Sequence, residues 1–238
     1  MEIKAVLFDL DGTLLPMEQE NFVNAYFGGL VKKLAPYGYE PKSLIDGVYI
    51  GTKAMVKNQS DKTNEEVFWD TFAHILGEKV RKDAKYFDEY YNLEFDLVQN
   101  ACGFNKESAV TVKKIKDMGF RVALATNPLF PAIATQKRIK WAGLKPEDFE
   151  LYTTYENSNR CKPNLEYYSQ ILDKLGLKGE QCLMVGNDVD EDMIVEKLGM
   201  RVFLLTDHLI NKSNKDLSTY PQGSFGDLLE FIKNINKD

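Results

Sequence analysis

Histidine and cysteine are scarce in this sequence of 238 residues, which contains two histidines and three cysteines. Cys102, Cys161 and Cys182 are odd in number and far apart, and no Cys-x-x-Cys pair is present. We therefore expect neither a disulfide framework nor a thiolate zinc site, and this cysteine usage is typical of a reducing cytoplasm. His74 and His208 lack the spacing of metal ligands, so a histidine metal site is not expected either.

Long apolar runs and a one-sided charge are also absent. No apolar run approaches the roughly 20 residues that a membrane helix needs, and no basic segment with an apolar stretch behind it precedes the first predicted strand. We therefore expect a cytoplasmic protein without a membrane partner. The 30 basic and 36 acidic residues give a net charge of −6, and the basic residues are dispersed. This distribution argues against nucleic acid as a partner and favours a small metabolite.

What the sequence does contain, from about residue 105 onward, is an alternation of helical patterns with short apolar strands. The apolar run before residue 9 adds a strand at the start. Helices are predicted over 105–118, 131–142, 164–175, 193–198 and from about 225, and strands over 120–126, 149–154, 182–185 and 201–206. This alternation is typical of an α/β fold with a parallel sheet, helices on both faces and ligands at the carboxyl ends of the strands.

Residues 16–100 have a different character. They are rich in aromatic residues at helical spacing, as in 21–34, 65–76 and 84–98, and they show no strand alternation. We predict an inserted helical cap over 16–100 and a core of 1–15 and 101–238. Most of the cap aromatics are expected to pack in its interior, with one or two lining a substrate pocket. Because the chain enters and leaves near 14–18 and 99–103, these segments are candidate hinges.

Polar side chains follow several of the predicted strands. Asp9 and Asp11 follow the first, Thr126 and Asn127 the second, and an acidic cluster follows the strand that ends at Gly186. The carboxyl ends of parallel strands share one edge of a sheet, so these groups are expected to converge. Two carboxylates side by side at the end of a buried strand cost free energy, and a divalent metal would neutralise them.

Four motifs in this order resemble those of the haloacid dehalogenase-like hydrolase superfamily. They are DLDGT at 9–13, Thr126 in an ATN segment, Lys162 in RCKPN and the acidic cluster after Gly186. Each follows a predicted strand, as in that superfamily, and the helical stretch resembles the cap that the superfamily inserts after its first motif. The resemblance implies a Rossmann-like catalytic core with an inserted α-helical cap.

The resemblance also implies roles for individual residues. Asp9 would be the nucleophile that forms an aspartyl-phosphate, and Asp11 would be the general acid and base. The Thr126 hydroxyl, the Asn127 main-chain amide and the Lys162 ammonium would bind the phosphoryl oxygens. Mg²⁺ would be held by Asp9, the main-chain carbonyl of Asp11 and an acid of the fourth motif.

The fourth motif departs from the commonest form of the superfamily. That form has an acid directly after the glycine, whereas this chain has Asn187, followed by Asp188, Asp190 and Asp192. We predict that Asp188 is the direct metal ligand and that Asp192 supports the site from behind, bonding to metal-bound water or to Lys162. The choice between Asn187 and Asp188 stays open at this point.

Asp11 selects among the reactions of the superfamily. Haloacid dehalogenases lack this second aspartate, and phosphonoacetaldehyde hydrolases replace it and use a cap lysine, for which Lys53 would be the candidate. A leaving alkoxide needs a proton, which Asp11 can supply. We therefore predict a Mg²⁺-dependent phosphatase that hydrolyses a small phosphorylated metabolite. A phosphosugar mutase of the β-phosphoglucomutase type and a catalytically silent binding module remain open alternatives, and the oligomeric state is not predicted.

Overall fold

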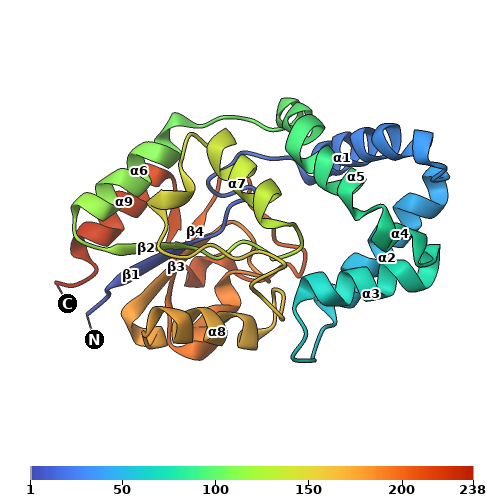
Figure 1. Ribbon diagram of the computed structural model, residues 1–238. Helices are drawn as coiled ribbons and strands as arrows, with labels where there is room; N and C mark the ends of the chain where they lie inside the picture. The colour runs from blue at the N-terminus through green and yellow to red at the C-terminus, as the bar shows by residue number, and fades with distance from the viewer. Residues whose placement is uncertain (1, 238) are drawn as a thin grey trace.

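The computed structural model describes residues 2–237 and contains a parallel sheet with the strand order β2-β1-β3-β4-β5 (Figure 1). The strands are β1 (Ala5–Phe8), β2 (Arg121–Leu124), β3 (Cys182–Gly186), β4 (Arg201–Leu205) and β5 (Gln222–Gly223). All pairs are parallel, and Ala5 of β1 lies opposite Arg121 on one side and Cys182 on the other. Every residue of β1 and β3 is buried, as a central parallel strand requires.

Helices cover both faces of this sheet, so the predicted α/β fold class is confirmed. One face of the sheet packs on α6 (Lys106–Asp117), α7 (Ala132–Trp141) and α9 (Phe225–Asn234), and the other on α8 (Leu165–Leu175) and a 3₁₀ helix (Met193–Leu198). Successive side chains of β1 alternate between the two cores, with Val6 and Phe8 on the first face and Ala5 and Leu7 on the second.

The predicted strand over 149–154 is wrong. This segment runs beside β2 but forms only one bridge, between Leu124 and Tyr152. The carbonyls of Val122 and Leu124, two residues apart, accept hydrogen bonds from the amides of Glu150 and Thr153, three residues apart. The segment therefore carries one extra residue, which breaks the ladder. The fifth strand is instead the short β5 at the opposite edge.

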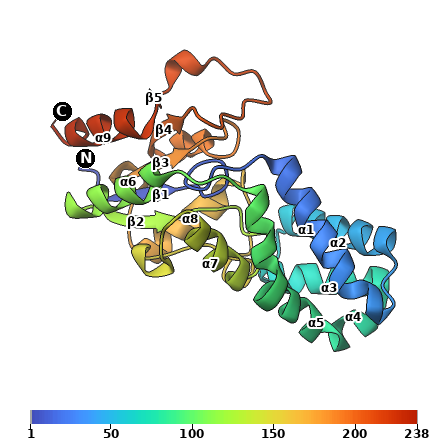
Figure 2. The same ribbon diagram turned by 90° about the horizontal axis from the view of Figure 1, so that it is seen from above.

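The regular elements between β1 and α6 are all helices, and we call residues 19–101 the helical insert. It comprises α1 (Gln19–Leu34), α2 (Pro41–Val56), α3 (Asn64–Leu76), α4 (Lys79–Lys82), α5 (Ala84–Glu89), a π-helical turn (Tyr90–Glu94) and a 3₁₀ helix (Phe95–Ala101), with a short 3₁₀ turn after α1. The insert lies beyond the carboxyl end of the sheet, as Figures 1 and 2 show from two directions. No helix within residues 2–237 is long and apolar enough to cross a membrane.

Glycines allow α2 and α3 to approach closely. A Cβ atom at Gly51 would lie 2.7 Å from the ring of Phe68, and one at Gly47 would lie 3.0 Å from the ring of Phe72. The rings of α3 therefore fill the space that side chains on this face of α2 would occupy. Thr63 begins α3 with a reciprocal capping box to Glu66.

The helical insert is joined to the rest of the chain by two covalent connections and by hydrogen bonds made elsewhere on its surface. The two covalent connections lie side by side, because Met17 and Cys102 form an antiparallel bridge and the Gly103 amide donates to the Pro16 carbonyl at 2.8 Å. Among the residues that make these hydrogen bonds is Asn64, which is fully buried at the start of α3. Its side-chain amide donates to the carbonyls of Pro128 and Arg160, each at 3.3 Å, and its main-chain amide donates to the Ser158 carbonyl at 2.8 Å.

Candidate active site

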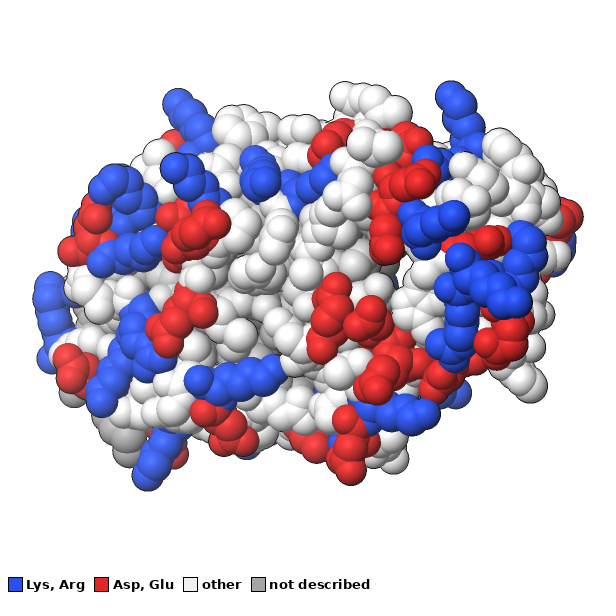
Figure 3. Space-filling view, viewed as in Figure 1, with Lys and Arg blue, Asp and Glu red and all other residues white. Residues whose placement is uncertain are grey.

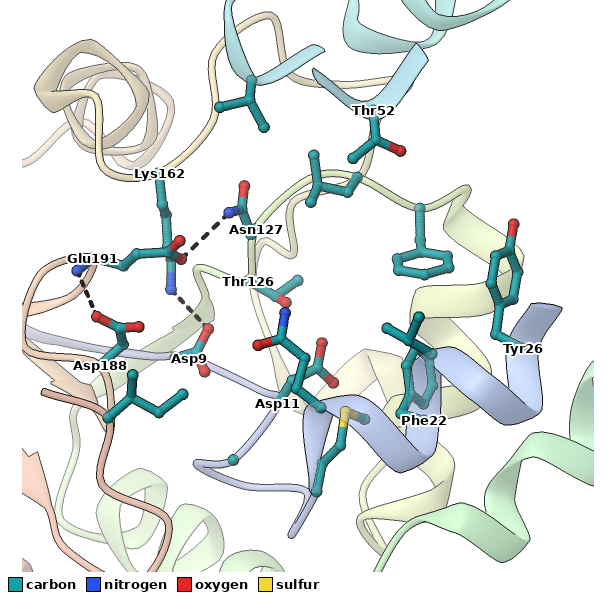
Figure 4. A pocket seen from close by; sticks show the side chains of 18 of the residues that line it. Asp9, Asp11, Phe22, Tyr26, Thr52, Thr126, Asn127, Lys162, Asp188 and Glu191 are labelled. Carbon is teal, nitrogen blue, oxygen red and sulfur yellow. Dashed lines mark hydrogen bonds and ion pairs between the residues drawn. The ribbon is translucent and has the colours of Figure 1, made fainter. Parts of the chain in front are cut away.

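A cavity of about 930 Å³ lies between the carboxyl end of the sheet and the helical insert. The predicted polar groups converge on its floor. Asp9 follows β1 and Asn187 follows β3, and both line the cavity together with Asp192. The cavity is also lined by Asp11, Thr126, Asn127, Lys162 and Asp188, which Figure 4 shows around Asp9. Residues from four separate chain segments thus meet at one edge of the sheet, as expected for strands that run in parallel.

Lys162 is the centre of a buried ion-pair network. Its Nζ atom lies 2.7 Å from Oδ1 of Asp9 and 2.6 Å from Oδ1 of Asp192, and the side chains of Lys162 and Asp192 are each 1% exposed. Burial alone would lower the pKa of Lys162, but the charges of Asp192 and Asp9 outweigh it and raise this pKa well above its usual value. The ammonium therefore stays charged beside Asp9.

The loop after β3 is fixed by its own side chains. Oδ2 of Asp192 accepts a hydrogen bond from the Asp188 amide at 3.0 Å, while Oδ1 of Asp188 accepts from the amides of Asp190 and Glu191 at 2.8 and 3.0 Å. Gly186 is required here, because a Cβ atom would lie 2.1 Å from Oδ2 of Asp192. The acidic cluster thus orders the loop as well as supplying charge.

Asn187 bonds the loop after β3 to the DLDGT motif at 9–13. Its Oδ1 accepts from the Thr13 hydroxyl at 2.9 Å, and its Nδ2 donates to the His208 carbonyl at 2.7 Å. Gly12 has a positive φ of 83°, and a Cβ there would lie 2.4 Å from Nδ2 of Asn187. The glycine of the first motif therefore makes room for this amide.

The donor set at the floor suits a hard divalent cation. Asp9 and Asp188 use Oδ1 for the hydrogen bonds described above, and Oδ2 of each carboxylate accepts none within residues 2–237. No group of three or more His, Cys, Asp or Glu side chains capable of holding a metal occurs in that part of the chain. Two carboxylates completed by a carbonyl, substrate oxygens and water match the habits of Mg²⁺, which retains several waters.

Asp11 pairs with Arg138 of α7, a residue that the sequence analysis did not single out. The guanidinium donates from Nη1 to Oδ2 of Asp11, while Oδ1 of Asp11 is buried without a hydrogen-bond partner in residues 2–237. The side chain of Asp11 is 32% exposed. Since it lines the cavity, that exposure is to the cavity, and desolvation raises its pKa against the opposing charge of Arg138. A raised pKa suits a proton donor.

The helical spacing of the sequence around Arg138 could have indicated that this residue is buried and paired. Arg138 occurs on the same face of α7 as Ala134, Thr135 and Ala142, all of them buried, so it interrupts an apolar stripe with a charge. Its side chain is 1% exposed, and its guanidinium carbon lies 4.7 Å from the centre of the Phe130 ring. A charge on a buried helix face requires a partner of opposite charge.

Thr126 and Asn127 lie beside Asp9. The Thr126 carbonyl is held by the hydroxyls of Thr153 at 2.6 Å and Tyr167 at 2.8 Å, which fixes this turn. The side-chain amide of Asn127 donates to Glu191 at 3.3 Å (Figure 4). Glu191, which the sequence analysis did not single out, also lines the cavity, and burial raises its pKa.

Two residues considered in the sequence lie outside this arrangement. Lys53 is exposed and does not line the cavity, so it is not positioned as a lysine nucleophile. Cys161 is buried, and burial raises the pKa of its thiol to about 12. A thiol with so high a pKa is a poor nucleophile at neutral pH.

Comparison with known proteins places these motifs in a family. The model of the haloacid dehalogenase-like hydrolases matches residues 3–195, a span that contains every predicted site residue. A glyceraldehyde 3-phosphate phosphatase of Methanocaldococcus jannaschii is 27% identical over 242 residues, which cover 99% of this chain and 100% of the relative. A pyrophosphatase PpaX of Halalkalibacterium halodurans is 27% identical, covering 79% of this chain and 76% of the relative.

Solved structures share the fold. A predicted phosphoglycolate phosphatase of Haemophilus somnus has a TM-score of 0.59 at 19% identity, covering 98% of this chain and 99% of that one. An L-2-haloacid dehalogenase of Xanthobacter autotrophicus has a TM-score of 0.57 at 14% identity, with coverage of 98% and 99%. At these identities the likeness shows the fold alone. Together with the match of the family model, it confirms the predicted membership: the chain belongs to the haloacid dehalogenase-like hydrolase family.

Proposed function

We propose that this protein is a Mg²⁺-dependent phosphatase that hydrolyses a small phosphate monoester in the cytoplasm through an aspartyl-phosphate on Asp9. The observation that carries the proposal is the state of Asp9. Lys162 holds one of its carboxylate oxygens at 2.7 Å, and the other accepts no hydrogen bond within residues 2–237 and belongs to a cavity-lining side chain. A nucleophile needs this combination of a fixed orientation and an available oxygen.

The reaction has two steps. Oδ2 of Asp9 attacks phosphorus, the bond from phosphorus to the ester oxygen breaks, and Asp11 gives its proton to the departing alcohol. Water then attacks the phosphorus of the aspartyl-phosphate, Asp11 takes a proton from that water, and orthophosphate leaves as Asp9 is regenerated. The pKa of Asp11, which desolvation raises, supports the first proton transfer.

Three groups would bind the transferring phosphoryl oxygens. The Thr126 hydroxyl and the Asn127 main-chain N–H make no hydrogen bonds within residues 2–237, so both are available as donors. Lys162 adds a fixed positive charge. Donors that are already oriented stabilise the developing charge without reorganising during the reaction.

Asp9, Asp188 and the main-chain carbonyl of Asp11 would hold Mg²⁺. The ion, when bound, supplies the positive charge that allows an anionic nucleophile to meet an anionic ester. The bonding supports Asp188 as the ligand, because Oδ2 of Asp188 accepts no hydrogen bond within residues 2–237, whereas Oδ1 of Asn187 already accepts one from Thr13. Asp192 supports the site by binding Lys162 and the Asp188 amide.

Residues 16–100 would act as the cap over a core of 1–15 and 101–238. The position of the helical insert over the cavity supports this division, because closing the cavity would exclude water from Asp9 and Asp11. Asp11 supports phosphatase over dehalogenase chemistry, since a carbon–halogen bond releases halide and needs no proton donor.

The test is phosphate release from a panel of phosphate esters with Mg²⁺ and with chelator. We expect Mg²⁺-dependent turnover that Asp9→Asn lowers by at least about 10⁴-fold. Formation of an isomeric phosphosugar without phosphate release would favour a mutase instead. Absence of turnover on the whole panel would favour the silent binding module.

A further inference from the structure

The wall of the cavity opposite Asp9 is apolar and aromatic. Between residues 17 and 91, sixteen residues line the cavity, and eight of them are aromatic. The single charged residue among the sixteen is Glu18, whose side chain is 74% exposed. Figure 4 shows Phe22 and Tyr26 facing the open space above Asp11, with Thr52 on the far side.

We infer that the alcohol released by this enzyme is uncharged and apolar, with an aromatic ring as the best-fitting body, and that it carries no second phosphate or carboxylate. This inference rests on the proposed phosphatase function and specifies the substrate class. It separates this chain from relatives whose names give pyrophosphate as their substrate.

Cations that could hold a second anionic group are missing from the aromatic wall. Within residues 2–237, Lys162 and Lys212 are the only lysines that line the cavity, and no arginine does. Lys162 already pairs with Asp9 and Asp192 at the phosphoryl end. Lys212 is exposed on the loop after β4, in a rim that also contains the acids Asp207 and Glu18. A carboxylate or second phosphate would therefore be buried against rings without a charged partner, which is unfavourable.

The tyrosines of the wall present their rings more than their hydroxyls. The hydroxyls of Tyr26 and Tyr91 bond to each other at 2.9 Å, and burial raises the pKa of Tyr26 to about 12. The Tyr26 ring meets the Phe130 ring edge-to-face at 5.4 Å, and the Phe27 and Tyr49 rings lie 5.0 Å apart. Such a lining recognises an apolar ring by contact area and edge-to-face geometry.

The size of the cavity agrees with a bulky alcohol. Its volume of about 930 Å³ is near the upper end of the roughly 300–1,000 Å³ of ordinary small-molecule sites. A two-carbon or three-carbon ester would leave the aromatic wall uncovered. Thr52, which lines the cavity from α2, offers one neutral hydroxyl for a polar atom of the alcohol.

The first experiment compares kcat/KM with Mg²⁺ for benzyl phosphate, glycerol 3-phosphate, 2-phosphoglycolate, pyrophosphate and phosphocholine. Benzyl phosphate and the other carbon esters release primary alcohols, so leaving-group ability is similar. We expect benzyl phosphate to exceed each of the others by about 10- to 100-fold, the range given by burial of one ring. A preference for 2-phosphoglycolate, pyrophosphate or phosphocholine would overturn the inference.

The second experiment places a lysine in the aromatic wall, which contains no cationic side chain. Thr52→Lys should raise kcat/KM for 2-phosphoglycolate by about 10-fold and lower it for benzyl phosphate, because the new ammonium enters the cavity wall. Ile50→Lys is the matched control, since Ile50 is 47% exposed on the same helix and does not line the cavity. It should change neither value by more than about 2-fold. If Thr52→Lys and Ile50→Lys changed kcat/KM equally, the inference that the wall selects substrates by charge would be contradicted.

A binding measurement separates failure of this inference from failure of the proposed function. Benzylphosphonate and phosphonoacetate cannot be hydrolysed, and their affinities for the wild-type protein with Mg²⁺ can be measured by calorimetry. We expect benzylphosphonate to bind at least about 10-fold more tightly. Equal or tighter binding of phosphonoacetate would overturn the inference, even if ester hydrolysis is observed. Tighter benzylphosphonate binding without turnover of any ester would show that the cavity selects an aromatic group but would overturn the phosphatase proposal.

Discussion

The two walls of the cavity differ in their side chains: one is made of paired charges and the other of packed aromatic rings. On the sheet side, charged groups from loops pair with one another, as Lys162 does with Asp9 and Asp192. On the side of the helical insert, rings pack edge-to-face with almost no charge. On the face of the molecule visible in Figure 3, basic and acidic side chains are interspersed over both halves. Within the cavity, the charged wall would hold the phosphoryl group of the proposed substrate and the aromatic wall its alcohol.

Replacing Lys162 removes the cation of the buried ion-pair network. Among the variants considered, it should lower the free energy of unfolding the most. Lys162→Met leaves Asp9 and Asp192 buried without their cation, so we expect the free energy of unfolding to fall by about 3–5 kcal/mol. Urea denaturation measures this change. Lys53→Met, at an exposed lysine of α2, is the control and should change the free energy by less than about 0.5 kcal/mol. A loss below about 1 kcal/mol for Lys162→Met would show that the network is not needed for folding.

Replacing Arg138 tests whether orientation of Asp11 matters on the same wall. Arg138→Met removes the partner of Asp11 without removing a cavity-lining residue. We expect kcat to fall by about 10- to 100-fold, because a misplaced proton donor slows both steps, while KM changes by less than about 3-fold. Steady-state kinetics on benzyl phosphate measures both, and Arg138→Lys should recover part of kcat. A rise in KM at unchanged kcat would contradict this role.

A smaller change sharpens the description of the aromatic wall. Tyr26→Phe removes the hydroxyl that bonds to Tyr91 but keeps the ring. The free energy of unfolding should therefore fall by about 1 kcal/mol, and the substrate preference should not change. Tyr49→Phe is the control, since Tyr49 is 53% exposed and its hydroxyl makes no hydrogen bond within residues 2–237. Thermal denaturation and the ester panel check both outcomes. A changed preference for Tyr26→Phe would mean that hydroxyls, and not rings, select the substrate.

The smallest effect is expected at Cys161, which is adjacent to Lys162 in the chain. Burial raises the pKa of its thiol to about 12, so almost no thiolate is present at pH 8. Iodoacetamide at pH 8 should therefore leave Cys161 of the folded protein unmodified and the activity unchanged, as mass spectrometry and an activity assay can show. Rapid labelling of Cys161 accompanied by loss of activity would reveal a thiol that takes part in the reaction.

Sequence patterns predicted the elements that depend on local periodicity. The covering helices, the strands β1 to β4 and the helical character of 19–101 follow from the spacing of apolar residues. The strand over 149–154 was predicted wrongly because an apolar pattern does not reveal one extra residue in the pairing with β2. Register depends on the partner strand as well as on the segment itself.

The site was predictable where the chemistry is carried by motifs, and less so where it depends on tertiary contacts. Asp9, Asp11 and Lys162 stand at motif positions, whereas the pairing of Arg138 with Asp11 joins residues 127 positions apart. The choice between Asn187 and Asp188 also depended on distant partners, Thr13 and the His208 carbonyl. Their roles as ligand and support stay predictions until a metal-bound form is measured.

The buried side chain of Asn64 bonds the helical insert to the core at a point away from its two covalent connections. If the insert rotated about the predicted hinges at 14–18 and 99–103, the bonds from Asn64 to the carbonyls of Pro128 and Arg160 would have to be exchanged for bonds to water. Such an exchange is a local unfolding of the turn before α3, with its own free-energy cost. Any opening of the insert would therefore carry the free-energy cost of breaking these bonds, and that cost would set the fraction of molecules that can admit an ester.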